Sequence, residues 1–240
     1  MRPDLVYDDR GLMLDLYTPE SGAGSRCPVV VLIHGGGFRG QSRKDGEIER
    51  IAVELAAHGI VAASIDHRLL HEDPQPSPHL AHLVHALPGV SIPATVVAAM
   101  EDTLAAIDYI RDRDEELGVD ADRLGLIGAS TGAITAAHIA YALDDHNVMP
   151  PVIRFVASLW GGVFLTPYEI TGGDPALFAV HGDADELMPV GMSDDLVSRA
   201  AAAGVRTEYH RIEGGTHGFA GVDFFAEPFR QLIEFARAHV

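Results

Sequence analysis

The stretch Leu126-Ile127-Gly128-Ala129-Ser130-Thr131-Gly132 decides the fold, because it carries the pattern G-x-S-x-G between an apolar run and an Ala-rich helical pattern. In that context the serine sits on a sharp strand-to-helix turn with strained backbone torsions. Residues two positions away on either side crowd the same space, so Gly128 and Gly132 must lack side chains. The following helix N-terminus favours negative charge at the site. The pattern predicts Ser130 as a nucleophile; the alternative is a serine that only caps the helix beginning at Thr131.

On both sides of this turn, short apolar runs alternate with helical patterns. The continuous runs at 29–34 and 60–66 are typical of strands buried on both faces of a sheet. The expected strands lie at residues 12–17, 29–34, 60–66, 123–128, 153–160, 176–181 and 205–212, and the expected helices at 47–58, 94–117, 131–143, 193–203 and 228–240. This alternation predicts the α/β class, with a mostly parallel central sheet and helices on both faces.

The length of 240 residues, of which 47% are hydrophobic, suits one domain over residues 1–240. No interdomain linker and no internal repeat interrupts the pattern. Residues 70–93 differ from the rest, because they hold five prolines and four histidines without a regular period. Loops in compact α/β domains usually run about 2–6 residues, and much longer ones tend to form lids or binding loops. We therefore expect a small cap insertion there.

Composition excludes several classes of function. The 35 Asp and Glu residues against 17 Lys and Arg give a formal net charge of -18, which argues against binding nucleic acid or an anionic membrane surface. The single cysteine, Cys27, allows no intrachain disulfide. Apolar runs such as 28–33 are far shorter than the roughly 20 residues that span a bilayer. Since Asp8, Asp9 and Arg10 interrupt the first residues, we expect no secretory leader and a cytoplasmic protein.

A glycine-rich loop follows the expected strand at 29–34, with His34-Gly35-Gly36-Gly37-Phe38 at the strand's end. Acyl transfer develops negative charge on a carbonyl oxygen, and backbone N–H groups aimed at that oxygen supply much of the rate enhancement. We expect Gly35, Gly36 and Thr131 to donate these N–H groups, and His34 to orient the loop. The alternative is a phosphate-binding loop, but no G-K-[ST] follows and the spacing G-x-G-x-x-G is absent.

An acid and a base follow in the order that such a serine requires. After the expected strand at 176–181 come three carboxylates, Asp183, Asp185 and Glu186, which compete for the role of the acid. After the strand at 205–212 comes His217, in a glycine-rich loop. A serine hydroxyl is a weak nucleophile unless a positioned base takes its proton, and His217 is placed to do so. The alternatives are a surface-loop histidine and a solvated acidic turn.

These residues make the chain resemble small bacterial carboxylesterases and lipases of the α/β-hydrolase superfamily with an H-G-G-G oxyanion motif, near its hormone-sensitive-lipase-like and feruloyl-esterase-like branches. The matching elements lie at residues 14–19, 34–37, 66–69, 128–132, 181–189 and 215–219. The resemblance implies Asp185 as the acid, with Asp183 and then Glu186 as weaker choices, and His217 as the base. The chain departs from the family in having Thr131 after the serine, His67 in place of a tyrosine, and the long segment 70–93.

The resemblance implies hydrolysis of small to medium carboxylic esters through a Ser130–Asp185–His217 triad and an acyl-enzyme, without a cofactor or metal. Residues that could line an apolar pocket for the ester, or equally pack in the core, are Phe38, Leu80, Leu83, Trp160, Phe164 and Phe219. A second hypothesis is an amidase, formamidase or peptidase on the same triad. A third, from another class, is a non-catalytic relative that binds a small ligand.

Two further patterns have alternative interpretations. His79, His82 and His85 recur at every third position, which suits either a metal site on a helix or a cap helix with a polar outer face. The strand at 205–212 is more polar than the others, which is typical of a sheet edge. An exposed edge invites pairing with a second copy, so the expected partners are a small-molecule ester and, through this edge, a homodimer.

Overall fold

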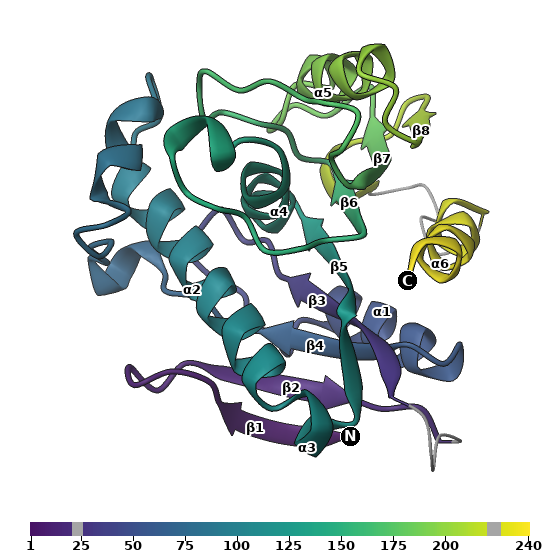
Figure 1. The fold of residues 1–240 in the computed structure, drawn as a ribbon. Coiled ribbons are helices and arrows are strands. Elements are labelled where there is room, and N and C mark those ends of the chain that lie inside the picture. The colour runs from purple at the N-terminus through teal and green to yellow at the C-terminus, as the bar shows by residue number, and fades with distance from the viewer. Residues whose placement is uncertain (21–25, 220–226) are drawn as a thin grey trace.

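A single sheet divides the molecule into two layers of helices (Figure 1). The computed structural model describes residues 1–20, 26–219 and 227–240. Within them the sheet has eight strands in the order β1-β2-β4-β3-β5-β6-β7-β8. The strands are β1 (Arg2–Val6), β2 (Met13–Tyr17), β3 (Cys27–Ile33), β4 (Val61–Ile65), β5 (Val119–Ala129), β6 (Phe155–Leu159), β7 (Ala176–Gly182) and β8 (Thr207–Ile212). From β4 to β8 all neighbours are parallel, whereas β1 and β2 pair antiparallel at one edge.

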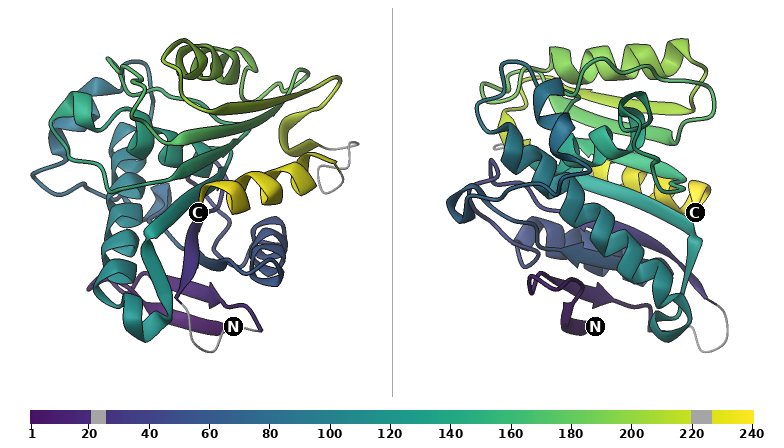
Figure 2. Two further views of the ribbon diagram at one scale, coloured as in Figure 1. Left: turned by 45° about the vertical axis from the view of Figure 1, so that its right-hand side comes forward. Right: turned by 60° about the vertical axis from the view of Figure 1, so that its left-hand side comes forward.

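Helices cover both faces of this sheet (Figure 2). One face carries α1 (Gly46–Ala57) and α6 (Glu227–His239), and the other carries α2 (Pro93–Asp112), α4 (Thr131–Tyr141) and α5 (Gly191–Ala202). The remaining short helices are α3 (Asp114–Leu117), η1 (Leu70–Glu72), η2 (Ala81–Ala86), η3 (Asp144–His146) and η4 (His217–Phe219). The α/β fold class with a mostly parallel, doubly covered sheet is therefore confirmed.

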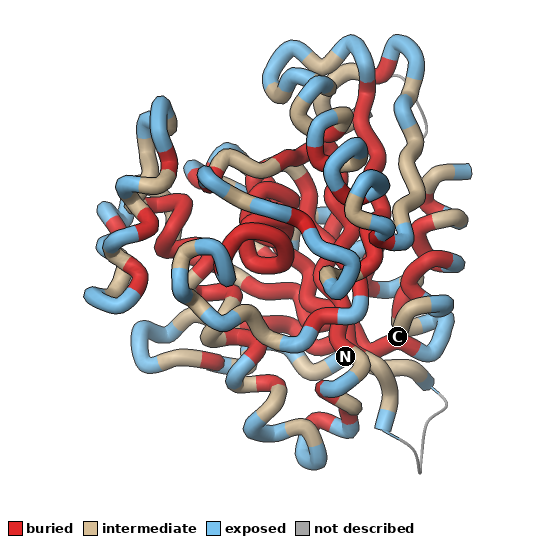
Figure 3. Tube along the Cα trace, turned by 45° about the horizontal axis from the view of Figure 1, so that its top comes forward, coloured by how far each residue is buried: buried red, intermediate tan, exposed pale blue. Residues whose placement is uncertain are grey.

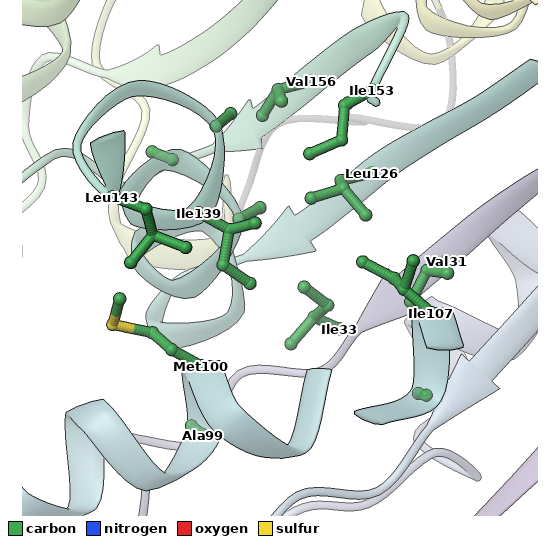
Figure 4. Packing of buried hydrophobic residues seen from close by; sticks show 14 of the residues in the cluster. Val31, Ile33, Ala99, Met100, Ile107, Leu126, Ile139, Leu143, Ile153 and Val156 are labelled. Atoms are coloured by element: carbon green, nitrogen blue, oxygen red, sulfur yellow. The ribbon is translucent and has the colours of Figure 1, made fainter. Parts of the chain in front are cut away.

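The central strands are continuously apolar because each contributes to two cores. In β3, Val29, Val31 and Ile33 face α2 and α4, whereas Val30 and Leu32 face α1 and α6. Figure 4 shows Val31 and Ile33 packed with side chains of α2 and α4. Each such side chain contributes about 1.5–3 kcal/mol when fully buried. In Figure 3 the buried residues accordingly follow the central strands and α4, while the exposed ones follow the outer loops.

Two elements differ from those that the sequence predicts. The strand β1 was not expected, since it has only five residues, includes Pro3 and is mostly exposed. It pairs antiparallel with β2 and forms the edge of the sheet. The helix expected at 94–117 is two helices, because Arg113 leaves the helical region with φ −125° and ψ 21°. As expected, the polar strand β8 lies at the opposite edge.

The segment 70–93 is mostly irregular, with the three-residue η1 and the six-residue η2 as its helices. The prolines explain this, since each removes a backbone donor and restricts the residue before it. The helix η2 packs against α2, and Leu80 just before it and Leu83 within it are almost fully buried in the larger core. The segment lies beside the N-terminal end of α2 (Figures 1 and 2).

A buried histidine joins α4 to the chain beyond β6. His138 is fully buried, and its Nε2 accepts hydrogen bonds from the N–H groups of Phe164 at 2.8 Å and Leu165 at 3.2 Å. Because Nε2 accepts, the ring carries its proton on Nδ1 and is neutral. Burial in an apolar environment lowers the pKa of His138 to about 3.

This histidine makes the stability depend on pH. Between about pH 3 and pH 6.5 the unfolded chain protonates His138 and the folded protein does not, so acidification favours unfolding. We expect His138→Leu to reduce the slope of unfolding free energy against pH by about 1 kcal/mol per pH unit between pH 4 and 5.5. Urea unfolding at several pH values measures this slope. The exposed His85→Leu serves as the control, and an unchanged slope in His138→Leu would contradict the assignment.

Candidate active site

Ser130 occupies a strained turn between β5 and α4. Its backbone has φ 53° and ψ −116°, outside the regions that L-residues favour. A Cβ on Gly128 would lie 2.2 Å from the carbonyl oxygen of Gly132, and a Cβ on Gly132 would lie 2.1 Å from the carbonyl oxygen of Ile33. Both glycines are therefore required by close backbone contacts, as the sequence pattern predicts. The serine N–H donates to Leu159 O at 2.8 Å, which ties the turn to β6.

Three polar side chains from separate strand ends meet at this turn. His217, in η4 after β8, places its Nε2 2.9 Å from Ser130 Oγ. Its Nδ1 lies 2.8 Å from Oδ2 of Asp185, which follows β7. The geometry suits an Nδ1–H that donates to the carboxylate, leaving Nε2 free to take the serine proton. A hydroxyl, an imidazole and a carboxylate are thus joined in one line of contacts.

The carboxylate of Asp185 is fully buried and held on both oxygens. Its Oδ1 accepts hydrogen bonds from the N–H groups of Leu187 at 2.9 Å and Met188 at 2.8 Å. Burial alone would raise the pKa of this carboxyl. The hydrogen bonds from Met188, His217 and Leu187 outweigh burial and lower its pKa below the usual value, so Asp185 is ionised near neutral pH.

The other two candidate acids lie elsewhere in the same loop. Asp183 accepts a hydrogen bond from the N–H of Gly214 at 2.7 Å, across the gap to the loop that follows β8. Glu186 is exposed. The two loops approach so closely that a Cβ on Gly182 would lie 2.1 Å from the carbonyl oxygen of Gly215. The carboxylate that reaches His217 is that of Asp185, and Asp183 instead joins the loops.

The glycine loop after β3 lies against the serine. A Cβ on Gly35 would stand 3.2 Å from Ser130 Cβ, and Gly36 adopts φ +91°, where side chains are strained. Thr131 is the first residue of α4, so its N–H has no acceptor within the helix. Gly36 and Thr131 line the same cleft as Ser130. An oxyanion formed on attack by Ser130 would need N–H donors at this place.

His34 and His67 support this loop from behind. Their rings stack with centroids 4.2 Å apart, and both residues are buried. His34 Nδ1 lies 3.0 Å from Gly35 O, which fits the role of orienting the loop that the sequence predicts. Burial, with a smaller contribution from the neighbouring His67, lowers the pKa of His34 to about 3. His34 is therefore neutral near neutral pH, and its Nδ1 contacts the glycine loop.

The serine opens into a cleft of about 480 Å³. Its lining includes Ser130, His217, Trp160 and the glycines 35–37. The ring of Trp160 meets that of His217 edge-on, with centroids 6.4 Å apart. The lining also includes residues that the sequence analysis did not single out, namely Gln41, Glu47, Leu187 and Met188. They lie in loops or in the first turn of a helix, where no sequence pattern indicates which side chains face a cleft.

A second hollow of about 490 Å³ adjoins the cleft and shares Gly37 and Thr131 with it. Phe38, Phe164 and residues 88–92 line it, so the end of the segment 70–93 reaches the site. Leu80 and Leu83, which the sequence offered as pocket residues, lie in the core and line neither hollow. The side chain of Phe219, another such residue, lies outside the described residues.

The three histidines at 79, 82 and 85 do not converge. His79 Nδ1 lies 2.8 Å from Ser77 Oγ, and His82 Nε2 lies 2.9 Å from His146 O. Among residues 1–20, 26–219 and 227–240, no group of three or more metal-ligating side chains could hold an ion. In the same ranges, no helix combines the length and apolarity needed to cross a membrane.

Known proteins share this fold and parts of this sequence. The family model described as BD-FAE matches residues 14–80, and the model described as alpha/beta hydrolase fold matches residues 93–176. The structure of Thermogutta terrifontis esterase 2 phosphonylated by cyclosarin is similar to this one, with a TM-score of 0.74 and 22% sequence identity. The alignment covers 96% of this chain and 90% of that chain. The chain has the α/β-hydrolase fold.

Curated relatives of this chain are longer proteins. Esterase LipI of Mycobacterium tuberculosis is 29% identical over 141 residues, which are 57% of this chain and 37% of LipI. Non-reducing polyketide synthase ausA of Aspergillus calidoustus is 31% identical over 149 residues, which are 58% of this chain and 5% of the synthase. The chain thus spans well under half the length of these relatives, and its activity must be argued from its own site.

Exchange of single carboxylates in this protein tests which one forms the functional contact with His217. We expect Asp185→Asn to lower kcat by about four orders of magnitude, because the amide no longer holds the required tautomer. The neighbouring Asp183→Asn provides the matched control, with kcat close to that of the unchanged protein. Steady-state kinetics on an activated ester measures both. The reverse pattern would assign the acid to Asp183.

The glycine contacts at the elbow can be tested by adding one methyl group. Gly132→Ala forces a Cβ against the Ile33 carbonyl, so we expect a loss of about 3 kcal/mol in unfolding free energy. Gly191→Ala is the matched control, since a Cβ at this first residue of α5 meets nothing within 4 Å. Equal unfolding midpoints in urea for the two variants would show that the elbow tolerates the side chain.

Proposed function

We propose that this α/β-hydrolase cleaves carboxylic esters of small to medium size through a Ser130–Asp185–His217 triad. The observation that carries the proposal is the unbroken line from Ser130 Oγ through both nitrogens of His217 to the Asp185 carboxylate, in a cleft bordered by the glycine loop. The relative LipI is an esterase, which supports the same class of reaction.

The reaction proceeds in two steps. His217 Nε2 takes the proton of Ser130 as Oγ attacks the ester carbonyl, and then gives that proton to the leaving alcohol. Water enters, loses a proton to His217 and attacks the acyl-serine, which releases the acid and restores Ser130. Asp185 stabilises the imidazolium that forms in both steps. Backbone N–H groups of Gly35, Gly36 and Thr131 bind the oxyanion, and the α4 N-terminus adds a favourable field.

The two adjoining hollows suit the two halves of an ester. The leaving alcohol must lie beside His217, whose cleft also holds Trp160. The acyl chain then extends past Gly37 and Thr131 into the second hollow, against Phe38 and Phe164. The end of the segment 70–93 closes this hollow, which is the role of a small cap. The limited volume favours small to medium acyl groups.

Assays with p-nitrophenyl esters of increasing acyl length test the function. We expect turnover by the unchanged protein that decreases for long chains, and loss of roughly a millionfold in kcat for Ser130→Ala. Circular dichroism of Ser130→Ala controls for folding. Retention of most activity by the folded variant would exclude Ser130 as the nucleophile. Turnover of amides or formamides in place of esters would assign the triad to an amidase or formamidase.

A further inference from the structure

A buried polar network lies directly behind the proposed acid. His181, in β7, has a side chain with 0% exposure, and its Nε2 lies 3.2 Å from Asp185 Oδ2 and 2.9 Å from Met188 O. On the other side of the ring, Nδ1 lies 2.7 Å from Ser193 Oγ in α5. The serine hydroxyl in turn lies 2.9 Å from Gly161 O, beyond the end of β6.

The partners of this ring define where its proton sits. Burial is the largest influence on the pKa of His181 and lowers it, so the ring is neutral near neutral pH. Met188 O and the ionised Asp185 carboxylate can only accept, and they both face Nε2. The single N–H of the ring is therefore at Nε2, and Nδ1 accepts from the hydroxyl of Ser193. Because a hydroxyl has one proton, Ser193 then makes no hydrogen bond to Gly161 O, although the two oxygens lie 2.9 Å apart.

With this tautomer, His181 completes a closed set of contacts around the turn 185–188. The N–H of Met188 donates to Asp185 Oδ1, while the carbonyl of the same residue accepts from His181 Nε2–H. His181 Nε2 also lies 3.2 Å from Oδ2 of Asp185. This is the carboxylate oxygen that His217 Nδ1 contacts. Both carboxylate oxygens are thus fixed relative to the rigid strand β7.

We propose that His181 is a positioning residue that sets the orientation of Asp185, and through it the tautomer and alignment of His217. The inference rests on the ester hydrolase function proposed above. His181 is absent from the residues that line the cleft, so it acts on the reaction only through Asp185. Ser193 extends the same support to α5, so Asp185 is anchored through His181 to two elements, β7 and α5.

Substitution of His181 by glutamine or by asparagine distinguishes a positioning role of the ring from a packing role. A glutamine at 181 can place its side-chain N–H near the position of histidine Nε2, whereas an asparagine reaches only the position of Nδ1. We expect His181→Gln to retain kcat within a few fold. We expect His181→Asn to lower kcat by about 10- to 100-fold with little change in KM, because small misplacements of catalytic groups have effects of this size.

A spectroscopic signature in the resting protein gives a readout that does not depend on turnover. The Nδ1 proton of His217, bonded to Asp185, resonates far downfield in proton NMR. We expect this resonance to remain in His181→Gln and to broaden or move in His181→Asn. If the unchanged protein hydrolyses no ester, the proposed function fails, yet the NMR comparison still tests the positioning role.

Ser193→Ala extends the test to the far side of the ring, and it removes only a hydroxyl. We expect a smaller decrease in kcat than in His181→Asn, and no further decrease when the two substitutions are combined, because both act through the same ring. Equal losses of kcat and thermal stability in His181→Gln and His181→Asn would show that the ring only packs. Full activity in both folded variants would also overturn the proposal.

Discussion

The close contact between the N-terminus of α4 and the ends of β3 and β5 is the constraint on which the rest of the site depends. There the absence of side chains at Gly128 and Gly132 lets backbone meet backbone, with Ile33 O and Gly132 O where a Cβ would stand. At this contact Ser130 adopts its positive φ, and its hydroxyl meets Nε2 of His217. It also brings the glycine loop after β3 to the serine, since that loop begins one residue past Ile33. One steric contact thereby places both the residue that we propose as the nucleophile and the backbone that we propose as donors to the oxyanion.

The parallel sheet supplies the other parts of the site. Because β3, β5, β6, β7 and β8 run in one direction, the loops after them emerge at the same edge. Gly35, Ser130, Trp160, Asp185 and His217 each follow a different one of these strands. Contacts between neighbouring loops then fix the spacing, as where Asp183 accepts from Gly214 and Ala184 donates to Gly215 O. The fold sets which residues approach, and the loop contacts set their distances.

The parts of the site that sequence could predict are those with a steric or chemical signature. The glycines around Ser130 and the glycine-rich surroundings of His217 have such a signature, and the structure brings both residues together. The proposed acid has no such signature, because Asp183 and Asp185 lie in the same loop. Only the structure distinguishes them, since the N–H groups of Leu187 and Met188 hold the Asp185 carboxylate in place. Leu80 and Leu83 show the same limit, since an apolar residue looks alike whether it faces a core or a cleft. The break at Arg113 and the edge strand β1 depend on tertiary packing, which local patterns do not contain.

Buried neutral histidines recur around this site, and their distribution has a physical reason. His34, His67, His138 and His181 are all buried with pKa values lowered by burial. A neutral imidazole offers one donor and one acceptor on a rigid ring, so it can join two backbone segments without placing a second charge near the imidazolium that forms on His217. A lysine or arginine in the place of His181 would lie beside Asp185 and compete with His217 for that carboxylate. In the function proposed above, proton transfer is thereby left to His217, because burial lowers the pKa values of the other four histidines and keeps them neutral.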